Sequence, residues 1–274
     1  MVQNTKRYTV ISGASSGIGY ETAKAFAKRG SNLILTARRT DRLKALQKEI
    51  LSLYPGLDVV VKAADLSIRQ NVFRLYEDVR PYPLQTWINN AGFGNYDSVG
   101  HQDLEKISRM LRVNVEALTI LSSLFVRDFK DVEKTQLINI SSCGGYTIVP
   151  NAVTYCAAKF YVSAFTEGLS WELKAAHAKM RAKVLAPAAA KTEFGKVAND
   201  AAEYDYDRAF GRYHTSAQVA AFLLELYDSD QVVGLVDREN FSFHLCGPKF
   251  QYAGSSQHNQ KMQTVCSDDQ GLPS

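Results

Sequence analysis

The stretch Ser12-Gly13-Ala14-Ser15-Ser16-Gly17-Ile18-Gly19 decides the fold of this chain. It follows a short β-type run, Tyr8-Thr9-Val10-Ile11, and leads into residues 18–29, which have the pattern of an amphipathic helix ended by Gly30. A glycine-rich turn is informative only between a strand and a helix. The sequence therefore predicts a phosphate-binding turn that joins the first strand to the first helix.

Each glycine of this turn has a physical task. Gly13 permits the tight turn, Gly17 lets a pyrophosphate approach the backbone, and Gly19 lets the helix pack close to the strand. Free N–H groups and a partial positive charge at the helix start attract the phosphates. A plain βα turn without a ligand is the alternative. We expect a dinucleotide to be bound by Gly13, Ser15, Ser16, Gly17, Ile18 and Gly19.

Strands and helices alternate along the rest of the chain. This alternation predicts an α/β fold, a Rossmann-type doubly wound parallel sheet with helices on both faces. Residues 1–254 show no linker or internal repeat and are expected to form one domain. The polar tail 255–274 is expected to be mobile, or to be ordered only by contact with another subunit. The predicted strands are 8–11, 32–36, 57–63, 87–90, 136–140 and 181–186, and the predicted helices are 18–29, 41–53, 67–79, 103–128 and 152–178.

Composition excludes several classes of protein. The chain has 274 residues with 46% hydrophobic side chains, which is enough for a sizeable core. Its net charge of +4, without a basic run, gives no support for nucleic-acid binding. No apolar run reaches the ~20 residues of a membrane span, and no signal segment begins the chain. The four cysteines and five histidines lack ligand spacing, so we expect no metal and a reduced, cytoplasmic protein.

The end of the second predicted strand bears on the choice of dinucleotide. NAD-selective sites place an acidic residue there, about 20 residues after the glycines. This chain has Ala37 at that position, followed by Arg38 and Arg39. A guanidinium can bind a 2′-phosphate through two hydrogen bonds, whereas a carboxylate would repel it. We expect NADP(H) as the cofactor, bound by Arg38; the alternative is that both arginines are solvated loop charges.

With these features, residues 6–250 resemble the short-chain dehydrogenase/reductase family, in its single-domain branch of roughly 250 residues. Further marks of that family follow in register. The resemblance implies that Asp65-Leu66 holds the adenine and that Asn90, in Asn89-Asn90-Ala91-Gly92, lies at the cofactor. It implies a catalytic set of Asn114, Ser142, Tyr155 and Lys159, with Pro187 and Thr192 beside the nicotinamide.

Tyr155 and Lys159 are four residues apart on a predicted helix and share one face. A phenol has an ordinary pKa of ~10, which a nearby ammonium lowers. Tyr155 could then exchange a proton with a carbonyl or alcohol oxygen. Ser142 would hydrogen-bond the same oxygen, whereas Ser141 points to the other side of the strand. The alternative is a core tyrosine with a solvated lysine.

By resemblance, Lys159 also holds the nicotinamide ribose, and Asn114 binds a water that links Lys159 to solvent. Two residues depart from the family pattern. Ser12 replaces a threonine and keeps its hydroxyl. Ala188 replaces the glycine after Pro187. Because alanine reaches positive φ less easily, the loop over the nicotinamide could follow a different path from that of the family.

Residues 188–215, the lid segment, are long for a connection and are expected to close over the ligands. The aromatic side chains within residues 203–213 either line a pocket for an apolar substrate or pack the lid on the body. Cys143 and Cys156 either react with electrophiles or fill tight space. The stretch 117–126 is apolar nearly all round, which predicts a homodimer or homotetramer.

The leading function is an NADP(H)-dependent oxidoreductase that transfers hydride between nicotinamide and a small-molecule carbonyl or secondary alcohol. The three residues between Tyr155 and Lys159 favour this reaction over C=C reduction. A catalytically silent NADP-binding sensor or scaffold is the alternative from another class. An isomerase or dehydratase that retains its cofactor is disfavoured by the glycine spacing.

Overall fold

A computed structural model describes residues 7–254 of the chain. Strands and helices alternate through most of it, as the sequence predicts. The strands are β1 (Tyr8–Ser12), β2 (Asn32–Ala37), β3 (Val59–Ala63), β4 (Leu84–Asn89), β5 (Gln136–Ile140), β6 (Arg181–Ala186), β7 (Ala190–Lys191), β8 (His214–Thr215), β9 (Val233–Val236) and β10 (Phe243–Cys246). The α-helices are α1 (Gly17–Lys28), α2 (Thr40–Leu53), α3 (Arg69–Val79), α4 (Leu104–Leu111), α5 (Leu118–Phe129), α6 (Val153–Ala175), α7 (Phe194–Ala198), α8 (Tyr206–Phe210) and α9 (Ser216–Asp228).

Eight of the strands form one sheet in the order β10-β9-β6-β5-β4-β1-β2-β3. All neighbouring pairs are parallel except β10 with β9, which is antiparallel. The chain starts at β1, builds outward to β3, and then returns to add β4 on the other side. This reversal beside β1 opens a crevice at the carboxyl ends of β1 and β4, where doubly wound sheets bind ligands. The predicted fold class is confirmed.

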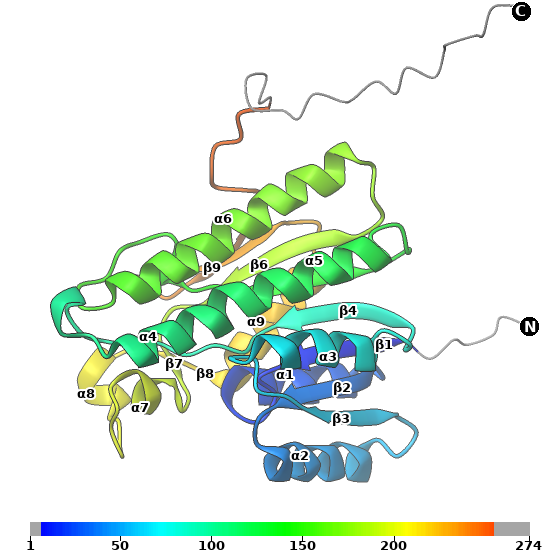
Figure 1. Cartoon of the computed structure of the whole chain (residues 1–274), viewed down its shortest axis with the longest axis horizontal. Helices are drawn as coiled ribbons and strands as arrows, with labels where there is room; N and C mark the ends of the chain where they lie inside the picture. Colours follow the sequence, from blue (N-terminus) through cyan, green and yellow to red (C-terminus); the bar gives the residue numbers. More distant parts are fainter. Residues whose placement is uncertain (1–6, 255–274) are drawn as a thin grey trace, which may run out of the picture.

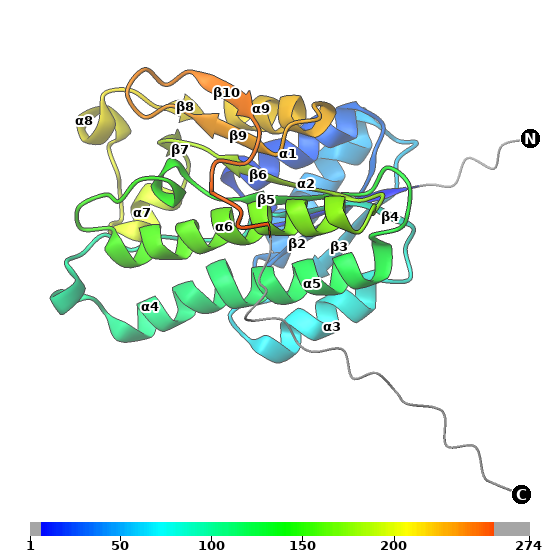
Figure 2. The same cartoon turned by 90° about the horizontal axis from the view of Figure 1, so that it is seen from above.

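Helices cover both faces of the sheet (Figures 1 and 2). One face is covered by α1, α2 and α9, which bury Phe26, Leu43 and Leu223 against the strands. The other is covered by α3, α5 and α6, around a core that includes Trp87 and Phe125. Because the central strands are buried on both sides, they are apolar in consecutive positions and do not alternate.

Buried polar groups tie the centre of the sheet to the second layer. Asn89 donates from Nδ2 to Ser122 Oγ at 3.0 Å and to Asn139 Oδ1 at 2.9 Å. Asn139 in turn donates to Thr166 Oγ1 on α6 at 2.9 Å. Buried polar networks that are satisfied in this way fix the relative positions of their elements. The network therefore sets the ends of β4 and β5 relative to α6.

The structure differs from the sequence prediction in its boundaries. The helix predicted over 103–128 is interrupted by a π-helical turn, Arg112–Ala117, between α4 and α5. The third strand begins at Val59 and the fourth at Leu84. The sequence made no prediction for α9, which packs on one face of the sheet, or for β9 and β10, which extend the sheet beyond β6. The tail 255–274 lies outside the described residues.

Candidate functional site

A cavity of about 750 Å³ lies at the carboxyl ends of the strands. One end is lined by the glycine turn and by Arg38 and Asp65, and the other by Ser142, Tyr155 and Lys159. The lid segment supplies a further wall, through residues between Ala188 and Phe210. Among the predicted site residues, all but Gly19 and Asn114 line this cavity. The fold thus brings together residues that are far apart in the sequence.

The glycine turn has the backbone that its sequence predicts. Gly13 and Gly17 have φ of +70° and +58°, a region that favours glycine. A Cβ on Gly13 would lie 2.9 Å from Ala91 Cα, so no larger residue fits between the turn and the end of β4. A Cβ on Gly19 would likewise lie too close to the Asn90 side chain. These glycines allow the turn and β4 to approach closely.

Ser12 and Asn90 hold this approach together. Ser12 Oγ accepts hydrogen bonds from the backbone N–H groups of Asn90 and Ala91, both at 3.0 Å. Asn90 Nδ2 donates to the Ser12 carbonyl at 2.9 Å. The serine in place of the family's threonine therefore uses its hydroxyl within the protein, where it joins β1 to the end of β4.

The start of α1 is suited to a phosphate. The cap residue Ser16 makes no side-chain hydrogen bond to the first-turn N–H groups, and no acidic residue occupies that turn. These N–H groups, the helix dipole and the length of the cavity fit a dinucleotide with its pyrophosphate at the turn. The residues present thus fit a nicotinamide dinucleotide. Gly13 to Ile18 would face the pyrophosphate.

The adenosine end of the cavity contains Arg38, Asp65 and Leu66. Asp65 accepts hydrogen bonds from Ser67 N at 2.9 Å and Ser67 Oγ at 2.7 Å. Burial raises the pKa of Asp65, but these hydrogen bonds and the charges of Arg38 and Arg109 bring it below its ordinary value. Arg38 is exposed and makes no hydrogen bond or ion pair within residues 7–254. It is available to an anionic ligand.

Arg39, not Arg38, contacts the glycine turn. Its guanidinium donates to Ser15 Oγ at 3.1 Å and to Ser16 Oγ at 2.8 Å. It also forms an ion pair with Glu193 at 2.8 Å. The sequence analysis gave no role to Glu193. Its position directly after Thr192, in a segment predicted to cover the cofactor, is the signal that could have identified it.

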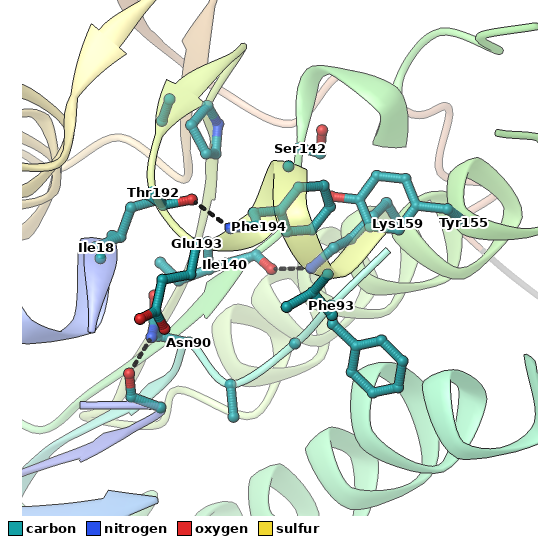
Figure 3. A pocket seen from close by; sticks show the side chains of 18 of the residues that line it. Ile18, Asn90, Phe93, Ile140, Ser142, Tyr155, Lys159, Thr192, Glu193 and Phe194 are labelled. Atoms are coloured by element: carbon teal, nitrogen blue, oxygen red, sulfur yellow. Dashed lines mark hydrogen bonds between the residues drawn. The ribbon is translucent and has the colours of Figure 1, made fainter. Parts of the chain in front are cut away.

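Tyr155 and Lys159 lie on the inner face of α6 and are both buried, with exposed fractions of 8% and 6%. Lys159 Nζ lies 5.8 Å from the centre of the Tyr155 ring and donates a hydrogen bond to the Ile140 carbonyl at 2.8 Å. Figure 3 shows both side chains in the pocket beside Ser142. The shared helix face that the sequence predicts is confirmed.

The pKa of Tyr155 differs from the sequence expectation. Burial raises the pKa of Tyr155 above its ordinary value, and the neighbouring Tyr96 adds to this, whereas Ser142 acts in the opposite direction. Burial also lowers the pKa of Lys159 to about 8. Lys159 therefore does not by itself lower the pKa of Tyr155 in this structure. The cost of desolvating the Tyr155 phenolate outweighs the attraction of the Lys159 charge.

Ser141 and Ser142 directly follow β5, with their hydroxyls in different surroundings. Ser141 Oγ donates to the Lys159 carbonyl at 2.9 Å and pairs with Ser163 Oγ at 2.7 Å. Ser142 Oγ accepts from Gly144 N at 3.0 Å and lines the cavity. Because the Ser141 hydroxyl already has two protein partners, Ser142 is the hydroxyl available to a ligand.

Asn114 lies in the π-helical turn and is buried. Its side chain donates to the Phe93 carbonyl at 2.8 Å and accepts from Phe93 N at 3.1 Å. A Cβ on Gly92 would lie 3.0 Å from Asn114 Oδ1 and 3.7 Å from Lys159 Nζ. Asn114 and Lys159 thus approach the same glycine from two helices. The water relay that the resemblance implies for them stays a prediction.

The loop after β6 is compatible with alanine at position 188. Ala188 is not among the described non-glycine residues with positive φ, so the missing glycine imposes no strain there. The Pro187 carbonyl accepts from Cys143 N at 2.8 Å. Thr192 Oγ1 accepts from Phe194 N at 3.0 Å, and a Cβ on Gly17 would lie 3.0 Å from the Thr192 methyl. The loop therefore lies directly over the glycine turn.

The aromatic residues of the lid segment both pack this segment together and line the cavity. Tyr206 is buried and its hydroxyl accepts from Gly195 N at 3.0 Å, so it packs α7 on α8. Tyr204, Tyr206 and Phe210 also line the cavity. The sequence analysis missed two further aromatic residues, Tyr96 and Phe194. Tyr96 follows β4, and only tertiary packing brings it to the lid.

The lid segment is anchored to α4. The buried ammonium of Lys106 forms an ion pair with Asp200 at 2.6 Å and lies 3.4 Å from the Ala198 carbonyl. Tyr96 N donates to the same carbonyl at 3.0 Å.

Cys143 also lines the cavity. Burial raises the pKa of the Cys143 thiol, which favours a space-filling role over a reactive one.

Between residues 7 and 254, His, Cys, Asp and Glu side chains do not gather in groups of three or more that could hold a metal ion. None of the helices in that part of the chain combines the length and apolar character needed to cross a membrane.

Comparisons with known proteins agree with this geometry. A family model described as short chain dehydrogenase matches residues 7–203. The Gallus gallus protein named dehydrogenase/reductase SDR family member 11 is 31% identical over 218 residues, 77% of this chain and 84% of its own length. The Homo sapiens protein of that name is 32% identical over 195 residues, 69% of this chain and 75% of its own.

A solved structure of the same family is also similar to this chain. A short-chain dehydrogenase from Sphingobium yanoikuyae in complex with NADPH superimposes with a TM-score of 0.76 and 28% identity. The match covers 83% of this chain and 86% of that one.

Proposed function

The chain belongs to the short-chain dehydrogenase family, and from this membership we propose that it is an NADP(H)-dependent oxidoreductase acting on a carbonyl or secondary alcohol. One observation carries the proposal. The cavity lined by Gly13 and Gly17 at one end is lined by Ser142, Tyr155 and Lys159 at the other. A nicotinamide dinucleotide would be held by the first group at its pyrophosphate and by the second at its nicotinamide end.

The bound nicotinamide supplies or accepts the hydride. In the proposed mechanism, Tyr155 gives its phenolic proton to the carbonyl oxygen during reduction and takes a proton from the alcohol during oxidation. Ser142 donates a hydrogen bond to that oxygen as negative charge develops on it. Lys159 holds the nicotinamide ribose, and Asn114 connects Lys159 to solvent through a water.

We assign NADP(H) over NAD(H) on the charges at the adenosine end. Ala37 stands at the position where NAD-selective proteins carry an acidic residue, and Arg38 beside it is free of hydrogen bonds and ion pairs within the described residues. A guanidinium there favours a 2′-phosphate. The similar Sphingobium protein is in complex with NADPH, which agrees with this assignment.

The walls of the cavity indicate the kind of substrate. Phe93, Tyr96, Phe194 and Tyr204 line it on the side of Tyr155. Aromatic walls of this kind favour apolar or ring-bearing groups. We propose a substrate that carries such a group next to its carbonyl or alcohol carbon.

We also propose a homo-oligomer built on the outer faces of α5 and α6. Tyr161 on α6 is 40% exposed, and its hydroxyl lies 2.9 Å from Thr119 Oγ1. Ile120 and Leu124 are only partly buried. A helical layer with apolar side chains on its outer side is well suited to a second copy across a twofold axis.

Steady consumption of NADPH with a panel of ketones and aldehydes tests the proposed activity. We expect turnover with bulky apolar ketones and weaker turnover with NADH. Binding of NADPH without turnover of any substrate would instead support a catalytically silent sensor.

A further inference from the structure

Two consecutive residues of the lid segment reach opposite ends of the cavity. Glu193 contacts the arginines at the adenosine end, and Phe194 packs on Tyr155, with ring centres 5.4 Å apart. Figure 3 shows the two side chains leaving the backbone in different directions, with the Phe194 ring toward Tyr155 and the Glu193 carboxylate away from it. A single peptide unit therefore connects the two ends of the cavity.

Glu193 is held by two arginines. Its carboxylate accepts from Arg39 at 2.8 Å and from Arg42 at 2.7 Å, across more than 150 residues of sequence. The hydrogen bond from Arg39, followed by those from Arg42 and Ser16, lowers the pKa of Glu193 to about 2. The side chain is thus an anion throughout the neutral range, and it neutralises part of the positive charge at the adenosine end.

A 2′-phosphate would need the same positive charge. Arg38 and Arg39 line the cavity and are consecutive, and Arg38 makes no hydrogen bond or ion pair within residues 7–254. Arg39 is already engaged by Glu193. Two anions on one guanidinium repel each other, so a phosphate that binds Arg39 competes with the carboxylate.

Phe194 directly follows this anchored residue. Its ring fits against Gly94, where a Cβ would lie 2.5 Å from Phe194 Cζ, and it meets the Tyr96 ring with centres 6.3 Å apart. The short helix α7 that begins at Phe194 is tied further along, through the Ala198 carbonyl to Tyr96 N at 3.0 Å. Its start is tied by Thr192 Oγ1 to Phe194 N at 3.0 Å and by the ion pairs of Glu193. Releasing Glu193 would loosen the start of this helix.

We propose that Glu193 is a specificity-determining residue for the cofactor: the 2′-phosphate of NADP(H) takes its place on Arg39, and this exchange releases the segment that holds Phe194 against Tyr155. The inference rests on the proposed preference for NADP(H). NAD(H) has no group to make the exchange, so it leaves Glu193 on both arginines.

Calorimetric titration with 2′,5′-ADP and with ADP tests this without any turnover. Both compounds contain adenosine with a 5′-phosphate and carry one further phosphate, which is on the 2′-oxygen in 2′,5′-ADP and on the 5′-phosphate in ADP. Glu193→Gln should bind 2′,5′-ADP about tenfold more tightly than the wild type, because one competing ion pair and one repulsion are removed. Its affinity for ADP should change by less than about twofold.

Glu133→Gln is the matched control. Glu133 forms an ion pair with Lys179 at 3.2 Å beside the amino end of β5, away from the cavity. This variant has the same change in net charge and should bind both compounds as the wild type does.

Hydrogen exchange gives a second measurement. Adding 2′,5′-ADP to the wild type should speed exchange at Val197 and Asn199, whose N–H groups bond to the Glu193 and Gly195 carbonyls. This compound lacks the nicotinamide and provides no replacement contact. ADP should leave exchange at both amides unchanged.

The outcomes separate this inference from the proposed function. If the wild type prefers 2′,5′-ADP and Glu193→Gln binds it no more tightly, the role of Glu193 is wrong while the NADP(H) preference stands. Equal tightening for ADP would also contradict it, because the effect would then be one of general charge. If neither protein distinguishes the two compounds, both the NADP(H) preference and the role of Glu193 are overturned.

Discussion

Lys159 donates its hydrogen bond to the Ile140 carbonyl at 2.8 Å and lies 5.8 Å from the centre of the Tyr155 ring, one helical turn away. In this geometry the ammonium is close enough to attract a phenolate but does not hydrogen-bond the Tyr155 hydroxyl. Burial therefore dominates, and it raises the pKa of Tyr155. A further positive charge is needed before Tyr155 can act as a base near neutral pH.

The oxidised nicotinamide would provide that charge. Alcohol oxidation at saturating NADP+ should rise with pH through an apparent pKa below the ordinary phenol value of ~10, because the base form of Tyr155 is the active one in that direction. In the free protein, Tyr155 should stay protonated up to at least that pH. A rate profile and a titration of tyrosinate absorbance, compared with Tyr155→Phe, measure the two values. An oxidation rate that does not rise until above pH ~10 would exclude this explanation.

The buried ammonium of Lys159 costs stability. Its pKa is lowered from its ordinary 10.5 to about 8 by burial, so the unfolded chain binds this proton more tightly than the folded one. The cost is fully present below pH 8 and disappears as the pH rises through 10.5. Lys159→Met should thus raise the free energy of unfolding near neutral pH by on the order of 1–3 kcal/mol.

Denaturant unfolding at neutral pH and near pH 10.5 measures this effect. The advantage of Lys159→Met should shrink at the higher pH, while its turnover and its affinity for NADPH should fall at every pH. A variant that is less stable than the wild type at neutral pH would show that the hydrogen bond to Ile140 outweighs the desolvation.

Arg38 provides a test of cofactor choice. Arg38→Ala should weaken NADPH binding by about ten- to a hundredfold and spare NADH, because it removes a charge-assisted contact to the 2′-phosphate only. Arg181→Ala is a matched control, since Arg181 is also exposed but begins β6, at the opposite end of the strands from the cavity. Direct titration with both cofactors is the measurement. Equal losses for NADPH and NADH would remove the basis of the assignment.

The outer faces of α5 and α6 predict an assembly. Light scattering at micromolar protein should give about two or four times the 30.4 kDa of one chain. Tyr161→Glu places a charge on the proposed interface and should shift the mass toward one chain, whereas Leu104→Glu, on the exposed start of α4, should not. A wild-type mass of one chain would contradict the prediction.

Local sequence predicts the parts of this protein in which one physical requirement dominates. The glycines of the turn, the spacing of Tyr155 and Lys159, and the apolar central strands each follow from short-range geometry. They lead to the doubly wound sheet and to most of the lining of the cavity. The antiparallel strand β10 was not predictable, because its place depends on pairing with β9 at the edge of the sheet.

The contacts of the lid segment also required the structure. Glu193 and Arg39 are more than 150 residues apart, and no periodic pattern connects them. The direction of the Tyr155 pKa shift depends on how deeply the ring is buried, which the spacing of two residues does not reveal. Sequence reasoning thus identified the groups and missed the balance of desolvation and charge among them.

Tyr155 as the proton donor is the central claim, and Tyr155→Phe tests it most directly. Phenylalanine keeps the ring and its packing on Phe194 but has no proton to exchange. General acid–base catalysis contributes typically 10²–10⁴-fold. On a ketone that the wild type reduces well, the variant should lose at least about a hundredfold in kcat while it binds NADPH with unchanged affinity and unfolds at the wild-type temperature. Near-normal turnover by Tyr155→Phe would contradict the account and would leave Ser142 or a bound water as the acid.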